Sequence, residues 1–165
     1  MYGICYVGTV LLNNFDCYLA GISMGGYGTL LIGLNHPEYF KGYGSISGAF
    51  ISNDISIANP LVVGFPDSVK RRQYYMDTFG PIDTFDNDPS RNVEAAISAH
   101  NVTDTLPTII LTCGTEDMLY PRNLRILNML ATNKISYQWE VFEGEDHLYP
   151  CFDKGLNFIL ESWFR

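Results

Sequence analysis

The chain has 165 residues, of which 47% are hydrophobic and 17% charged, and this is too apolar for a disordered chain and about the size of one domain. Its formal net charge of −8, without a Lys/Arg cluster, argues against a nucleic-acid partner because the phosphate backbone would repel it. The apolar run Ile4 to Leu12 is too short and too interrupted by glycine to cross a bilayer, and no basic residue precedes it as in a signal peptide. We therefore expect a cytoplasmic protein with no membrane partner.

The chain contains four cysteines and three histidines: Cys5, Cys17, Cys113, Cys151, His36, His100 and His147. The cysteines form no CxxC pair, whereas disulfide scaffolds are denser and zinc sites need closely spaced ligand pairs. We therefore expect buried, reduced thiols, no metal and no cofactor. Any histidine-dependent chemistry must use one of the three imidazoles.

Four short segments have the composition of strands: Asp16–Ile22, Tyr43–Ile46, Pro107–Cys113 and Tyr137–Phe142. Asp16–Ile22 and Pro107–Cys113 are typical of strands buried on both faces of a parallel sheet, and Tyr43–Ile46 is predicted as a second short strand. The fourth alternates between apolar and polar residues, and we expect it near a sheet edge.

Helices are predicted between these strands. Residues 24–35 carry apolar side chains at helical spacing, and the helix ends before Pro37 because a proline disfavours helix at the residue before it. A second helix begins at Pro121 and a third closes the chain. Their predicted apolar stripes are Leu124, Leu127, Leu130 and Ala131 for the second helix, and Phe152, Leu156, Ile159, Leu160 and Trp163 for the third.

The segment from about residue 47 to residue 104 is irregular and resembles a cap-like insertion, with helices near 67–77 and 91–99. From residue 16 onward, strands otherwise alternate with helices. This order predicts one domain over residues 1–165, of class α/β, with a mostly parallel sheet in a three-layer α/β/α arrangement. Active sites in such sheets lie at the carboxyl ends of the strands.

The pattern G-x-S-x-G occurs at Gly21-Ile22-Ser23-Met24-Gly25, between a predicted strand and a predicted helix. There it is typical of a nucleophile elbow, because the glycines remove side chains that would collide and the tight turn lifts the serine hydroxyl clear of the sheet. The backbone N–H of Met24 would then point at the oxyanion of a tetrahedral intermediate. The alternative is that Ser23 is an ordinary N-cap.

A serine nucleophile needs a base, and the base needs an orienting acid. Asp117 follows the third predicted strand in the sequence CGTED, with Glu116 as the alternative acid, and His147 follows the fourth strand in the sequence EGEDH. Because the carboxyl ends of parallel strands meet at one edge, Ser23, Asp117 and His147 are predicted to converge, in the chain order known for this geometry.

Each of these residues has a structural alternative. Asp117 could be a solvated loop carboxylate, and His147 could be an ordinary surface residue. His36, at the far end of the helix after the elbow, and His100, in the insertion, are expected to be structural.

Four blocks in this order resemble the esterase D-like group of α/β-hydrolases: Gly21–Gly28 (GISMGGYG), Ser45–Gly48 (SISG), Cys113–Asp117 (CGTED), and Gly144 with His147. The group includes tributyrin-type acetyl esterases, feruloyl esterases and S-formylglutathione hydrolases. The resemblance covers about residues 16–165 and implies a partial α/β-hydrolase fold. It also implies hydrolysis of short-chain acyl or aryl esters through an acyl-enzyme, with Ser23, Asp117 and His147 as the triad.

The chain departs from this group before the elbow. Members normally carry a longer region there, which forms the first strands and supplies the second oxyanion N–H, whereas only fifteen residues precede Asp16 here. We therefore expect the elbow strand to be an unpaired sheet edge. The chain is interpreted as a fragment of an esterase, a shortened homologue that completes itself as a homo-oligomer, or an inactive remnant.

Two other functions remain open: a non-catalytic binding module, and an acyltransferase that passes the acyl group to a sugar or alcohol. The insertion carries aromatic residues that could line an acyl or aryl pocket or simply pack locally. They are Phe50, Phe65, Tyr74, Tyr75, Phe79 and Phe85.

Overall fold

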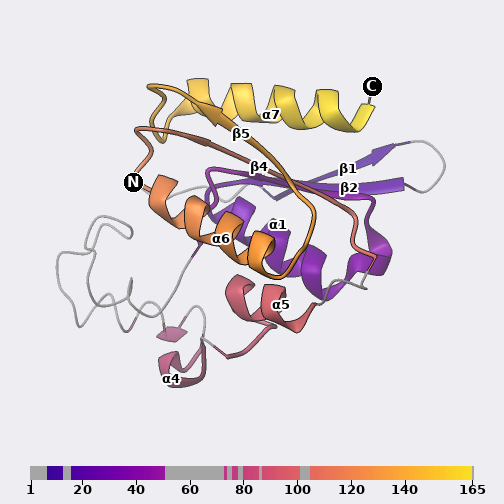
Figure 1. Cartoon of the computed structure of the whole chain (residues 1–165), viewed down its shortest axis with the longest axis vertical. Coiled ribbons are helices and arrows are strands. Elements are labelled where there is room, and N and C mark those ends of the chain that lie inside the picture. The colour runs from indigo at the N-terminus through magenta and orange to yellow at the C-terminus, as the bar shows by residue number, and fades with distance from the viewer. Residues whose placement is uncertain are drawn as a thin grey trace.

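The computed structural model describes residues 7–12, 16–50, 73, 76–77, 80–85, 87–100 and 105–164. Within these residues lies a five-stranded sheet in the order β1-β2-β3-β4-β5 (Figure 1). Its strands are β1 (Val7–Leu12), β2 (Asp16–Ile22), β3 (Gly42–Ile46), β4 (Thr108–Gly114) and β5 (Gln138–Phe142). Strands β2 to β5 are parallel, so the four predicted strands and the mostly parallel sheet are confirmed.

Strand β1 overturns one prediction. It pairs antiparallel with β2 from Val7 opposite Gly21 to Leu12 opposite Asp16, so the elbow strand is not a sheet edge. The two segments are separated by three residues in the sequence, a spacing typical of a hairpin. Glycine and threonine interrupt the apolar pattern of β1, and for this reason its periodicity did not identify it as a strand.

Helices cover both faces of the sheet, which confirms the three layers (Figure 1). Helices α1 (Met24–Asn35), α5 (Val93–Ala99) and α6 (Tyr120–Thr132) lie on one face, and α7 (Tyr149–Phe164) lies on the other. The remaining described helices are η1 (Pro37–Tyr39) and α4 (Ile82–Phe85). None of the helices in the described part of the chain is long and apolar enough to cross a membrane.

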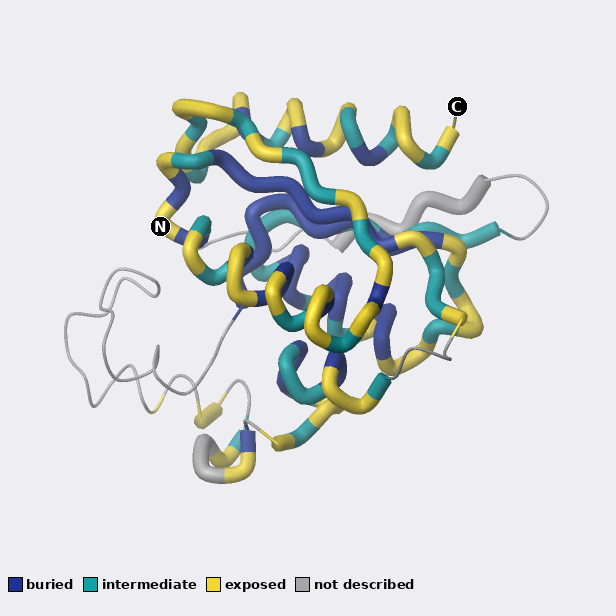
Figure 2. The backbone as a smooth tube through the Cα atoms, in the orientation of Figure 1, coloured by how far each residue is buried: buried dark blue, intermediate teal, exposed yellow. Residues whose placement is uncertain are grey.

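The central strands are buried on both sides (Figure 2). Side chains alternate along β4, so that Ile109 and Leu111 belong to the core under α1, α5 and α6, while Ile110 packs with Ile46 and Ile159 under α7. This two-sided burial explains why the β3 and β4 segments contain few polar residues.

Helix α5 begins two residues later than predicted, because the Asn92 side chain caps it by accepting a hydrogen bond from the Glu94 N–H at 2.8 Å. Helix α4 was not predicted. The helix predicted near residues 67–77 lies largely outside the described residues.

The predicted stripe of α6 is partly wrong. Leu127 and Leu130 are buried as expected, but Leu124 and Ala131 are exposed. The buried face is centred instead on Asn123 and Ile126, since the Asn123 amide donates hydrogen bonds to the carbonyl groups of Gly48 and Leu119. A pattern of apolar residues cannot predict that an asparagine is buried.

In α7 the prediction is wrong for Leu156, which is 39% exposed. The helix packs on the sheet through Cys151, Gly155 and Ile159, which are spaced about one helical turn apart. A Cβ atom on Gly155 would lie 2.5 Å from Thr112 Oγ1, so this glycine permits the close approach of α7 to the sheet.

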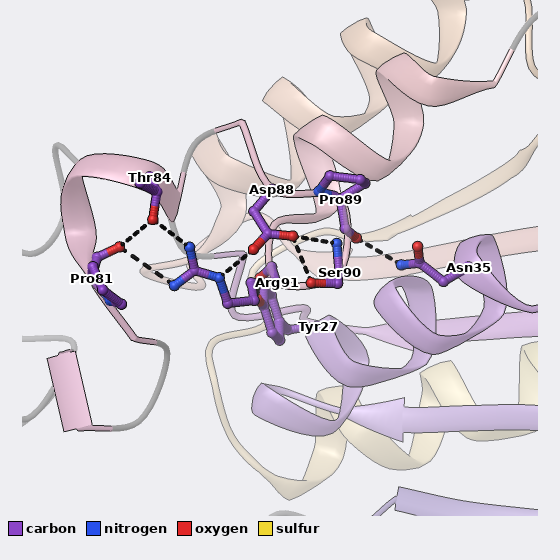
Figure 3. A network of polar contacts seen from close by, with 8 residues as sticks. All are labelled: Tyr27, Asn35, Pro81, Thr84, Asp88, Pro89, Ser90 and Arg91. Carbon is purple, nitrogen blue, oxygen red and sulfur yellow. Dashed lines mark hydrogen bonds and ion pairs between the residues drawn. The ribbon is translucent and has the colours of Figure 1, made fainter.

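A polar network ties the helix after the elbow to the segment that precedes α5 (Figure 3). The Tyr27 hydroxyl donates to the carbonyl of Arg91, and the Arg91 guanidinium in turn binds Asp88 at 2.7 Å and Thr84 at 2.8 Å. Asn35 at the end of α1 donates to the carbonyl of Pro89 at 2.7 Å. Burial raises the pKa of Tyr27, so its hydroxyl keeps the proton that it donates.

One side of α6 is buried and the other is exposed. Replacing leucine by alanine should therefore lower the free energy of unfolding at a buried position and leave it nearly unchanged at an exposed one. Leu130→Ala, at a fully buried site, should lower the free energy of unfolding by about 2–5 kcal/mol. Leu124→Ala, on the exposed side of the same helix, should change it by less than about 0.5 kcal/mol. Urea denaturation followed by circular dichroism measures both, and equal losses would contradict the orientation of α6.

Candidate active site

Ser23 alone forms the turn between β2, which ends at Ile22, and α1, which begins at Met24. Its φ of 57° and ψ of −116° lie outside the favoured regions for a non-glycine residue, a strain of order 1–3 kcal/mol. A Cβ atom on Gly21 would lie 2.3 Å from the carbonyl oxygen of Gly25. Only glycine at position 21 therefore permits this turn, which has the form of a nucleophile elbow.

Backbone hydrogen bonds hold the strained turn from two sides. The Ser23 N–H donates to the carbonyl of Ile46 at 2.9 Å, and the Ser23 carbonyl accepts from the Ala49 N–H at 2.9 Å. The Ser23 side chain makes no capping hydrogen bond to α1. The interpretation of Ser23 as an ordinary N-cap is therefore not supported.

Asp117 lies in the turn between β4 and α6 and is only 3% exposed. Its Oδ1 atom accepts a hydrogen bond from the Leu119 N–H at 2.8 Å, which fixes the carboxylate within its own loop. The neighbouring Glu116 is exposed. Of the two acids proposed from the sequence, the structure buries Asp117.

His147 follows β5, and its loop must cross the end of β4 to reach the elbow on β2. Glycine at position 114 makes this crossing possible, because a Cβ atom there would lie 2.1 Å from the carbonyl oxygen of Glu145. The Glu116 N–H donates to that same carbonyl at 2.9 Å, and the Thr115 N–H donates to Phe142 at 3.1 Å. The loops that carry Asp117 and His147 are thus joined by backbone hydrogen bonds.

The three predicted side chains converge in one hydrogen-bonded chain. His147 Nδ1 lies 2.8 Å from Asp117 Oδ2, and His147 Nε2 lies 3.0 Å from Ser23 Oγ. An ionised carboxylate can only accept, so Nδ1 carries the proton and Nε2 accepts from the serine hydroxyl. This arrangement allows the imidazole to remove the hydroxyl proton when Ser23 attacks an electrophile.

The electrostatics favour an ionised Asp117. Burial alone would raise the pKa of Asp117, but the hydrogen bonds from His147 and the Leu119 N–H outweigh it, and the pKa lies below its usual value. The carboxylate therefore stays charged at neutral pH and can orient the imidazole.

An aromatic ring supports the imidazole from the side. Phe152, on the first turn of α7, meets His147 edge to face at a centroid distance of 5.1 Å and an interplanar angle of 82°. The apolar periodicity of the sequence assigned Phe152 to the core, and its contact with His147 was not foreseen. The exposed Tyr149 ring lies 6.1 Å from that of Phe152.

The other two histidines take no part in this hydrogen-bonded chain. His100 Nε2 is 2.7 Å from the Leu34 carbonyl and His36 contacts Tyr39, as expected for structural histidines. Burial raises the pKa of Cys113 and of Cys151, which disfavours the reactive thiolate form of both side chains.

Cys17 is half-buried, so the prediction of buried thiols does not hold for it, and Cys5 lies outside the described residues. Within the described ranges, no three His, Cys, Asp or Glu side chains are grouped so as to hold a metal ion.

The aromatic residues of the insertion divide into two sets. Phe50 and Phe85 are buried in the main core, which supports local packing rather than a pocket lining. The other four, Phe65, Tyr74, Tyr75 and Phe79, lie outside the described residues.

The fold and the site define an α/β-hydrolase-like chain with a serine elbow. The family model described as "Putative esterase" matches residues 10–159, and the chain therefore belongs to this family. The resemblance seen in the four sequence blocks is confirmed.

The chain is also similar to three known hydrolases. An acetyl esterase of Caldicellulosiruptor saccharolyticus is 27% identical over 128 residues, which are 77% of this chain and 47% of that protein. The crystal structure of S-formylglutathione hydrolase (FrmB) from Staphylococcus aureus superimposes with a TM-score of 0.64 at 24% identity, over 88% of this chain and 53% of that one. For esterase B from Lactobacillus rhamnosis the TM-score is 0.63 at 14% identity, over 88% of this chain and 50% of that one. The chain thus spans about half the length of these relatives.

The lowered pKa of Asp117 predicts a pH dependence of stability. A carboxyl group with a pKa depressed by folding stabilises the fold above its unfolded pKa of 3.8, and this contribution is lost as the pH falls through the lower folded value. Wild type should therefore lose stability below about pH 4 more steeply than Asp117→Asn. Denaturant titrations at several pH values measure the slope, and Asp153→Asn, at an exposed site on α7, is the matched control that should keep the wild-type slope. Equal slopes for wild type and Asp117→Asn would contradict the prediction.

Proposed function

We propose that this chain carries the catalytic triad of a serine carboxylesterase, with Ser23 as nucleophile, His147 as general base and acid, and Asp117 as the orienting acid. The observation that supports the proposal is the continuous hydrogen-bonded chain from Ser23 Oγ through both imidazole nitrogens to a buried carboxylate. Membership in an esterase family points to the same chemistry.

In the first step, Ser23 Oγ attacks the ester carbonyl carbon while His147 Nε2 takes the hydroxyl proton. The imidazolium that forms is stabilised by the Asp117 carboxylate at Nδ1. Collapse of the tetrahedral intermediate breaks the bond to the alcohol oxygen, and Nε2 returns the proton to this leaving group. The product of the step is an acyl-enzyme on Ser23.

In the second step, water attacks the acyl carbon and gives a proton to His147 Nε2. Collapse of the new intermediate releases the carboxylic acid, and the proton returns to Ser23 Oγ. The imidazole is neutral again, so the cycle can begin with another ester molecule.

The oxyanion of both intermediates needs hydrogen-bond donors. The Met24 N–H is at the first position of α1, directly after the nucleophile, where the helix dipole also favours negative charge. We assign one donor of the oxyanion hole to Met24. Loss of such a donor lowers kcat by about 10²–10³.

We infer a short-chain acyl ester as the substrate, because the acetyl esterase relative is named for this class. Acetyl esters with a chromogenic alcohol, such as p-nitrophenyl acetate, are the first substrates to test. Product analysis with added alcohols distinguishes hydrolysis from acyl transfer.

The proposal predicts covalent labelling and turnover at Ser23. A fluorophosphonate probe should label wild type at Ser23, and Ser23→Ala should lose labelling and reduce kcat on p-nitrophenyl acetate by about 10⁴-fold or more. Ser98→Ala, at an exposed serine on α5, should behave as wild type.

Mass spectrometry of the labelled peptide and absorbance of p-nitrophenol measure these outcomes. A folded wild-type sample that is neither labelled nor more active than Ser23→Ala would overturn the proposed function.

A further inference from the structure

Asn123 on α6 is a buried polar residue for which the triad gives no reason. Its side chain is fully buried, on the face of the helix that packs against the core. The Nδ2 atom donates to the carbonyl of Leu119 at 2.9 Å and to that of Gly48 at 3.0 Å. Within the described residues the Oδ1 atom has no hydrogen-bond partner, which costs free energy in a buried position. The fold thus retains this asparagine for its two donated bonds, in spite of the unpaired oxygen.

The first bond anchors Asn123 to the loop of the acid. The N–H of Leu119 donates to Asp117 Oδ1 at 2.8 Å, and the carbonyl of the same residue accepts from Asn123. That carbonyl also accepts from the backbone N–H groups of Arg122 and Asn123, each at 3.0 Å. It therefore keeps hydrogen-bond donors when the Asn123 side chain is removed, and the effect on the site is expected through the second bond.

The second bond leads to the nucleophile. The Gly48 carbonyl and the Ala49 N–H belong to one trans peptide group, so they point to opposite sides of it. The carbonyl accepts from Asn123, and the N–H donates to the Ser23 carbonyl at 2.9 Å. One peptide group is thus held between a buried side chain of α6 and the strained residue of the elbow.

We propose that Asn123 is a positioning residue of the active site, whose amide fixes the peptide group between Gly48 and Ala49 and, through it, the backbone of Ser23. This inference rests on the proposed function. The strained turn persists only while neighbouring groups hold it. Without the amide, the peptide group loses a donor on one side and holds the Ser23 carbonyl less firmly on the other. The Ser23 hydroxyl then spends less time within 3.0 Å of His147 Nε2.

The test is Asn123→Leu, which removes both donors and keeps a side chain of similar shape. We expect kcat on p-nitrophenyl acetate to fall about 10- to 100-fold, because a misplacement of about 1 Å at the reacting groups has an effect of this size. Labelling of Ser23 by a fluorophosphonate should slow by a similar factor. KM should stay within about twofold, since Asn123 is fully buried and cannot contact an ester.

Asn133→Leu is the matched control. The Asn133 side chain also donates to the carbonyl four residues earlier, that of Met129, at 2.9 Å, but this bond stays within the end of α6. Its removal should leave kcat unchanged. Leu130→Ala is the control for stability, because it removes buried packing from the same helix and should lower the free energy of unfolding while the folded protein keeps its kcat.

Asn123→Ala is the second variant, and the same loss of kcat is expected for it. A wild-type kcat in either folded Asn123 variant would overturn the proposal. An equal loss in Leu130→Ala would also overturn it, since any weakening of α6 would then be sufficient. Failure of both Asn123 variants to fold would overturn it as well, because the role would then be structural.

Hydrogen exchange measured by NMR separates this inference from the proposed function. The Ala49 amide, bonded to the Ser23 carbonyl, should be protected in wild type and exchange severalfold faster in Asn123→Leu. The Leu119 amide should keep its protection and serves as the internal reference. If wild type hydrolyses no ester, the proposed function fails, yet the exchange of Ala49 still tests Asn123. Unchanged exchange of Ala49 in Asn123→Leu would overturn the positioning role.

Discussion

The parallel register of the central strands is the constraint on which the site depends. Ile22 of β2 is level with Ile46 of β3, and Ile46 with Thr112 of β4, so the carboxyl ends of these strands lie along one edge. Ser23 and Asp117 follow their strands after very short connections and need little chain to meet there. His147 starts farther away, and only the bare backbone at Gly114 lets its loop pass over the end of β4. The convergence of Ser23, His147 and Asp117 is therefore a product of the sheet geometry and of the short turns that follow the strands.

Much of this geometry could be predicted because it depends on short, local sequence patterns. The elbow has its own pattern of glycines around Ser23, and each partner residue follows a strand that the sequence predicts. What the sequence did not reveal depends on contacts between distant segments: the face of α6 is set by the buried Asn123, which bonds to the carbonyl of Gly48, and the contact of Phe152 with His147 requires α7 to be in place. The sequence placed Ser47 only in the block Ser45–Gly48, because no sequence pattern predicts a positive φ at a serine.

Family membership and site geometry refer to the same part of the chain. The family match spans residues 10–159, and all three residues of the proposed triad lie inside it. The matched part of the chain covers about half of each relative's length, so the agreement concerns the segment that holds Ser23, Asp117 and His147. This segment combines two strained serines, and both are held by backbone bonds across neighbouring strands.

The close seating of α7 has a mechanical consequence for the base. The helix begins two residues after His147, and Gly155 lets it lie directly on β3 and β4. A helix packed this closely on the sheet leaves the short connection to His147 little freedom, so the position of the imidazole depends on the position of α7. A tilt of α7 would therefore displace His147 Nε2 relative to Ser23 Oγ.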